Sequence, residues 1–129
     1  MKKRPFPKPT EGELAILRVL WRRGASTVRE VLDGLNKTQE TGYTTVLKMM
    51  QIMTDKRLLE RDDAERTHVF KPRLAEDETQ RQLVTDLLDR AFNGSAKKLV
   101  LHALSTGKAS ARDIAEITRL LDGIEGGAR

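Results

Sequence analysis

Residues 42–72 constrain the fold more than any other stretch of this chain. The first half predicts an amphipathic helix from about Tyr43 to Arg57, whose inner side carries four apolar residues: Val46, Met49, Met50 and Met53. At about 3.6 residues per turn, the spacings i, i+4, i+7 and i+11 put four polar residues on the outer side: Thr44, Lys48, Gln51 and Asp55. The second half predicts a two-stranded hairpin with a charged tip, with strands at 58–61 and 67–71. Three hairpin residues are expected to pack against the helices: Leu59, Val69 and Phe70.

Two further helices are predicted upstream, and each begins with a capping box of the form S/T-x-x-E. The first box is Thr10–Glu13 and the second is Thr27–Glu30. The first helix should end near Gly24, and its apolar side carries Leu14, Leu17, Leu20 and Trp21. The second should end around Asn36, and its apolar side carries Val28, Val31, Leu32 and Leu35. Trp21 is also a candidate binding aromatic, although its spacing favours the core.

Three short helices followed by a hairpin are typical of a winged helix-turn-helix. The predicted fold is therefore mainly α with a small β-hairpin wing, followed by a C-terminal helical dimerisation region. We expect a flexible basic arm at residues 1–9, a winged helix-turn-helix DNA-binding domain at 10–73, a helical dimerisation domain at 74–125 and a frayed tail at 126–129.

The C-terminal region predicts three helices that are strongly apolar on one side, beginning near Glu76, Ser95 and Ser110. Leaving such stripes in water is costly, and a two-fold dimer is the commonest way to cover them. The alternative is that they pack back on the winged helix of the same chain. The expected dimer interface comprises Leu83, Val84, Leu87, Leu88, Ala91, Phe92, Leu99, Ile117, Leu120 and Leu121.

The positive charge of the chain is concentrated in its first part. The net charge is +5, and residues 1–75 hold 16 Lys and Arg against 10 Asp and Glu, whereas residues 76–129 hold 8 against 9. This distribution favours a polyanionic partner for the winged helix. The basic N-terminus lacks the apolar segment of a secretory signal, no apolar run is long enough to span a membrane, and there is no Cys, so a cytoplasmic location is expected.

The sequence carries none of the usual catalytic, nucleotide-binding or metal-binding motifs. The two histidines, His68 and His102, fall in separate predicted elements and are best interpreted as surface or partly packed residues. Two acidic clusters are explained without a catalytic role, because Asp62-Asp63 falls in a predicted turn and Glu76-Asp77-Glu78 at a predicted helix start. We therefore predict no enzyme, no metal, no cofactor and no small-molecule substrate.

The residues predicted to contact DNA lie on the third helix and on the wing. Lys48 has the reach for a guanine edge or a phosphate, Gln51 could pair with adenine, and the two threonine hydroxyls or methyls could meet phosphate or a thymine methyl. The complete predicted set is Tyr43, Thr44, Thr45, Lys48, Gln51, Arg61 and Arg66. The acidic residues at the wing tip, Asp62, Asp63 and Glu65, argue against a tip that hugs DNA uniformly.

The order of these motifs resembles the BlaI/MecI/CopY family of penicillinase-type repressors. The phrases that carry the resemblance are TEGELAILRVLWRRG, STVREVLDGL, YTTVLKMMQIMTDKRLL and THVFKP, in that order. The resemblance extends over nearly the whole chain. The resemblance implies a homodimeric winged-helix repressor bound to a palindromic, TACA/TGTA-like operator upstream of resistance or stress genes. It maps major-groove contacts onto Thr44, Thr45 and Lys48, and backbone contacts onto Arg66 and its neighbours.

The chain departs from this family at positions that bear on function. Many relatives have a basic residue in place of Ile52 and Gly in place of Arg57. In the β-lactam branch a membrane sensor protease triggers cleavage at an Asn-Phe bond, and the matching bond here is His102–Ala103, so that cleavage motif is absent. The Cys-x-Cys metal site of the copper-responsive branch is absent too.

Two other classes remain open at this point. A winged-helix protein-interaction module without sequence-specific DNA binding would use the stripe from Leu83 to Phe92 for a different chain. A ligand-sensing regulator of the MarR type usually has a longer chain with helices on both sides of the winged helix, and no helix is predicted before Thr10.

Overall fold

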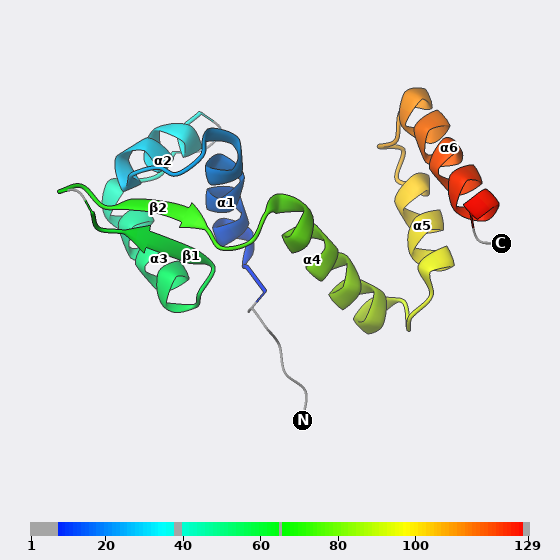
Figure 1. Cartoon of the computed structure of the whole chain (residues 1–129), viewed down its shortest axis with the longest axis horizontal. Coiled ribbons are helices and arrows are strands. Elements are labelled where there is room, and N and C mark those ends of the chain that lie inside the picture. The colour runs from blue at the N-terminus through cyan, green and yellow to red at the C-terminus, as the bar shows by residue number, and fades with distance from the viewer. Residues whose placement is uncertain (1–7, 38–39, 65, 128–129) are drawn as a thin grey trace. The chain divides into compact units, whose positions relative to one another are not determined.

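The computed structural model describes residues 8–37, 40–64 and 66–127, and places side chains as far as residue 124 (Figure 1). Contacts between residues divide the chain into two compact units, Met1–Leu83 and Val84–Arg129. The boundary falls inside helix α4 (Glu76–Ala91). Most of the predicted basic arm lies outside the described residues, and Pro9 is buried in the first unit.

The first two helices begin as the sequence predicts. Helix α1 (Glu11–Arg23) is capped by Thr10, whose N–H donates to Glu13 Oε1 at 2.9 Å, while the Glu13 N–H donates to Thr10 Oγ1 at 3.2 Å. Thr27 and Glu30 repeat both bonds, at 2.9 and 3.2 Å, at the start of α2 (Val28–Leu35). Both predicted capping boxes are therefore confirmed.

Helix α3 (Tyr43–Asp55) ends two residues earlier than the predicted boundary at Arg57. The Leu58 N–H donates to the Met53 carbonyl at 2.8 Å and the Arg57 N–H donates to the Thr54 carbonyl at 3.0 Å, which is the Schellman pattern of a helix C-terminus. This pattern puts Arg57 in the left-handed region, with φ of 71°. Glycine is the usual residue there, because any Cβ adds strain.

The wing is an antiparallel pair of short strands, β1 (Leu59–Asp62) and β2 (Val69–Pro72), in which Leu59 pairs with Pro72 and Asp62 with Val69. Both strands start later than predicted, by one residue for β1 and two for β2. Ser26, just before α2, forms a β-bridge with Phe70 through two backbone hydrogen bonds of 3.0 and 2.8 Å. This bridge fixes the base of the hairpin to the start of α2, and the predicted wing is confirmed.

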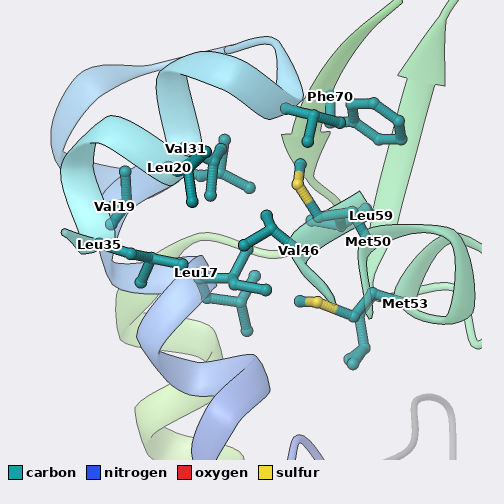
Figure 2. Packing of buried hydrophobic residues seen from close by; sticks show 14 residues of the cluster. Leu17, Val19, Leu20, Val31, Leu35, Val46, Met50, Met53, Leu59 and Phe70 are labelled. Carbon is teal, nitrogen blue, oxygen red and sulfur yellow. The ribbon is translucent and has the colours of Figure 1, made fainter. Parts of the chain in front are cut away.

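The first unit has one hydrophobic core, in which side chains of α1, α2 and α3 meet the base of the wing (Figure 2). Its members are Ile16, Leu17, Val19, Leu20, Val28, Val31, Leu32, Leu35, Val46, Met50, Met53, Leu58, Leu59 and Phe70. Four residues predicted to be in the core are only partly buried: Leu14, Trp21, Met49 and Val69. Trp21 lies at the edge of this core because its indole N–H donates to the Leu74 carbonyl at 3.0 Å.

An ion pair joins the start of α1 to the end of α3. The Glu13 carboxylate, only 5% exposed, accepts bonds of 2.9 and 2.8 Å from the Lys56 ammonium. Burial alone would raise the pKa of Glu13, but the hydrogen bonds from Lys56 and from the Thr10 N–H outweigh it, so the pKa lies below its ordinary value. The ion pair therefore stabilises the folded chain where this carboxyl is charged.

The second unit contains the end of α4, α5 (Ala96–Ser105) and α6 (Ala111–Gly127). Ser95 caps α5 by accepting from the Lys98 N–H at 3.2 Å, and Ser110 forms a reciprocal pair of 3.0 Å bonds with Asp113 at the start of α6. Among the side chains described in this unit, none is buried. In the described part of the chain, no helix is long and apolar enough to cross a membrane.

The Lys56→Met variant tests the ion pair. At about pH 7 it should lower the free energy of unfolding by about 1–3 kcal/mol, because a buried carboxylate loses its cation. Glu13 has a lowered pKa when folded, so its contribution is full above the unfolded value of 4.5 and is lost as pH falls through the folded value. In urea titrations, the deficit of the variant should therefore shrink at acidic pH, whereas exposed Lys37→Met should show little deficit at either pH. A deficit independent of pH would contradict this assignment.

The Arg57→Gly variant tests the strained end of α3. A left-handed residue with a Cβ costs about 1–2 kcal/mol and glycine loses about 0.5–1 kcal/mol more chain entropy, so the variant should be stabilised by roughly 0.5–1 kcal/mol. Thermal and urea unfolding would measure it. The matched change in an ordinary helical position, Arg18→Gly in α1, should instead destabilise by about 1 kcal/mol. Destabilisation by Arg57→Gly would show that the Arg57 side chain contributes more to the stability of the fold than its left-handed backbone conformation costs.

Candidate nucleic-acid interface

Helix α3 presents a polar face opposite its core face. Val46, Met50 and Met53 are buried, which fixes the rotation of the helix about its axis. Four predicted contact residues on the other side are exposed: Thr44, Thr45, Lys48 and Gln51. A buried side on three helical turns and an exposed polar side of the same length suit insertion into a major groove.

Ile52 also lies on the exposed part of α3, with 46% of its surface accessible. It follows Thr45 and Lys48 at spacings of seven and four residues, so the three share one side of the helix. The exposed face of α3 is thus not uniformly polar. An apolar side chain in this position can contact a thymine methyl but cannot pair with a phosphate.

Two side chains of the wing, Arg61 and His68, share one carboxylate. Asp63 Oδ1 lies 2.8 Å from Arg61 Nε and 2.7 Å from His68 Nδ1, and all three side chains are about half exposed. Asp62 Oδ1 accepts from the Ala64 N–H at 2.9 Å, which shapes the described part of the tip. Asp62 and Asp63 therefore have local partners, and in this structure Arg61 is already part of an ion pair.

A cavity of about 350 Å³ lies between the start of α2, one side of α3 and the wing. It brings together four of the residues predicted from the sequence: Tyr43, Gln51, Arg61 and Arg66. Thr44, Thr45 and Lys48 do not line it. The surface predicted to bind DNA thus has two parts, the open face of α3 and a cavity beside it.

Arg29 also lines this cavity and was not among the residues predicted to bind DNA. Its guanidinium carbon lies 5.1 Å from the centre of the Tyr43 ring, a cation–π arrangement that holds it over α3. One sequence signal was available. Arg29 is in the first turn of α2, where the helix dipole disfavours a cation. Helix stability therefore does not explain an arginine in this position, which indicates another role.

The residues predicted to form a dimer interface are not buried. Five are half-buried: Leu83, Leu88, Phe92, Leu99 and Ile117. The other five are exposed: Val84, Leu87, Ala91, Leu120 and Leu121. Leu120 reaches 65% exposure, and four more apolar residues of α5 and α6 are similarly exposed: Val100, Leu101, Ile114 and Ile124.

The two histidines belong to different units, and each has a local neighbour. His68 pairs with Asp63, and the His102 ring lies 5.7 Å from the Phe92 ring. In the parts of the chain that the structure describes, no group of three or more metal-ligating side chains is found.

Comparison with known proteins identifies the class of protein to which this arrangement belongs. The penicillinase repressor of Bacillus licheniformis is 26% identical over 122 residues, which cover 95% of this chain and 94% of that protein. The transcriptional regulator BlaI of Mycobacterium tuberculosis is 30% identical over 90 residues, which cover 69% of this chain and 65% of that protein.

A solved structure shows the same winged helix. The solution structure of monomeric Bacillus licheniformis BlaI in complex with the blaP half-operator superposes with a TM-score of 0.50 at 27% identity, over 60% of this chain and 93% of that one. The family model described as penicillinase repressor matches residues 9–123. The fold and the family predicted from the sequence are therefore confirmed, and this chain belongs to the penicillinase repressor family.

Proposed function

We propose that this chain is a dimeric transcriptional repressor that binds a palindromic DNA operator through α3 and the wing. The observation that carries the proposal is the exposed polar face of α3 beside a cavity lined with arginine. The relative of known structure is described as bound to a half-operator, which supports the same use of the shared fold here.

The proposed roles of the α3 residues follow from their exposed side chains. Lys48 donates to a guanine edge or to a phosphate, and Gln51 pairs with adenine through its amide. Thr44 and Thr45 contact phosphate or a thymine methyl. Arg61 and Arg66 contact the backbone from the wing, and Tyr43 lies between these two sets at the start of α3.

The dimer is proposed from the state of the second unit. Its described side chains include none that is buried, and eight of its large hydrophobic residues are at least 45% exposed. At about 25 cal/mol per Å² of apolar surface, leaving this much in water is unfavourable. A second copy covers the same surfaces on both chains, and its two-fold axis matches the symmetry of a palindromic operator.

Relief of repression by proteolysis would require a change in helix α5. A membrane sensor protease that acts on the bond between His102 and Ala103 would meet it inside helix α5. Proteases bind their substrates in extended form, so α5 would have to unfold locally before cleavage. Control of a resistance or stress operon is proposed from the resemblance to the family alone.

The first test measures DNA binding and size together. Fluorescence anisotropy of a duplex from the upstream region of the gene should show tight, salt-sensitive binding by a dimer, and a scrambled duplex should bind more weakly. Equal weak binding to both duplexes by a protein that sizes as a monomer would contradict the repressor proposal. It would favour a winged-helix module that binds another protein.

The Lys48→Ala variant tests base contact by α3. Loss of one good base contact should weaken binding to the operator by about 1–3 kcal/mol and leave binding to scrambled DNA nearly unchanged. Anisotropy titrations on both duplexes measure the difference. An equal loss on both would instead assign Lys48 to a phosphate, and no loss on either would remove it from the interface.

The Leu120→Glu variant tests the dimer. Because Leu120 is 65% exposed, the change should not disturb folding of the chain, but a carboxylate in an apolar interface should shift the protein to monomer in analytical ultracentrifugation. Affinity for the full operator should fall with it. Arg112→Gln, at an exposed position of the same helix, removes one positive charge and should leave the dimer intact. A dimeric Leu120→Glu protein would place the interface elsewhere.

A further inference from the structure

The cavity between α2, α3 and the wing has the side chains of an anion-binding site. Its described lining contains three arginines, Arg29, Arg61 and Arg66, together with His68, and no carboxylate. We propose that this cavity binds a phosphodiester of the DNA backbone and that Arg29 is a phosphate-binding residue oriented by Tyr43. The inference rests on the proposed function, because it names the group on DNA that the cavity takes.

Arg29 is available for a phosphate. Among the described residues it has no carboxylate within salt-bridge distance, and its guanidinium carbon lies 5.1 Å from the centre of the Tyr43 ring. Stacking on an aromatic ring uses the face of the guanidinium and leaves its N–H groups free to donate in the plane. The ring thus holds the charge in place without neutralising it.

The other cations of the cavity add to the same site. Arg66 is exposed and, among the described residues, also lacks a carboxylate partner. Arg61 and His68 share Asp63, and a phosphate entering the cavity competes with that carboxylate for Arg61. Charge-assisted bonds from several arginines to one phosphate are stronger than any single exposed ion pair.

A backbone phosphate is favoured over a free one because α3 and the cavity share residues. Tyr43 and Gln51 belong to α3 and also line the cavity. A DNA strand whose bases meet the exposed face of α3 therefore carries its phosphates past the cavity wall. At about 350 Å³, the cavity has room for a phosphate with part of its sugar.

The first measurement is the salt dependence of DNA affinity for Arg29→Ala. Removing one phosphate contact should lower the slope of log affinity against log salt by about 0.9, with weaker binding to operator and scrambled duplexes alike. Arg29→Lys should keep most of the slope, because it keeps a positive charge at this position. Arg18→Ala, at an exposed arginine of α1 outside the cavity, should keep the full slope.

Thermal unfolding separates a binding role from a structural one. Arg29 sits in the first turn of α2, where a cation opposes the helix dipole, so Arg29→Ala should unfold at the same temperature as wild type or slightly higher. A stable Arg29→Ala protein with an unchanged salt slope would overturn the proposal.

Single methylphosphonate substitutions in the upstream duplex locate the phosphate. A neutral linkage at the contacted position should weaken wild-type binding and leave Arg29→Ala unaffected, and all other positions should affect both proteins equally. Equal effects at every position would overturn the proposal.

Competition with inorganic phosphate distinguishes a cavity that binds a phosphodiester of the DNA backbone from one that binds a free phosphate ion. If the cavity takes a backbone phosphodiester, free phosphate should compete with DNA no better than sulfate at equal ionic strength. Competition by phosphate at low concentration, abolished by Arg29→Ala, would overturn the backbone assignment in favour of a small-anion site. Wild-type protein that binds neither duplex would refute the proposed function itself, whereas wild-type binding that Arg29→Ala leaves unchanged would refute only the phosphate site.

Discussion

The buried carboxylate of Glu13 connects the helix that starts the fold to the helix that presents the candidate interface. One oxygen accepts from the Thr10 N–H and so completes the capping box of α1, and both oxygens accept from the Lys56 ammonium just after α3. A charged group with 5% exposure is tolerated only because each of these donors is in place. The same group therefore sets where α1 begins and holds the end of α3.

The ion pair holds the end of α3, and the hydrophobic core fixes the rotation of this helix about its axis. Val46, Met50 and Met53 insert between α1, α2 and the base of the wing, so α3 cannot rotate without exposing them (Figure 2). The Ser26–Phe70 bridge then sets the wing against the start of α2. The position of each polar side chain of α3 is thus a consequence of packing on its other side, which is how a small domain can present a rigid surface to a ligand.

Sequence patterns predicted the features of this fold that depend on neighbours a few residues apart. The capping boxes, the apolar faces of α1 to α3 and the hairpin are of this kind. The pairing of Glu13 with Lys56, 43 residues apart, leaves no local signal, and neither does the bridge from Ser26 to Phe70. The early end of α3 had a partial signal, because relatives with glycine at the position of Arg57 indicate a left-handed residue.

The candidate site also divides into a part that local sequence patterns predict and a part that depends on packing between elements. Helical spacing is sufficient to place Thr44, Lys48 and Gln51 on one face, since that face is defined by a single helix. The cavity involves three elements, and its membership depends on how α2 and the wing pack around α3. The periodicity of a single helix therefore does not relate Arg29 to the interface, whereas the shared cavity and the 5.1 Å approach to Tyr43 do.

The second unit links stability to DNA binding if the proposed dimer forms. The described side chains of this unit are all at least partly exposed, so its helices gain most of their apolar burial from the proposed partner chain. Folding of this unit, association of two copies and occupancy of a two-part operator then become coupled equilibria. A dimer offers the second winged helix at high effective concentration once the first has bound, so a modest loss of association lowers operator affinity steeply. Any signal that destabilises α5 or α6 would relieve repression through this coupling, without touching α3 or the wing.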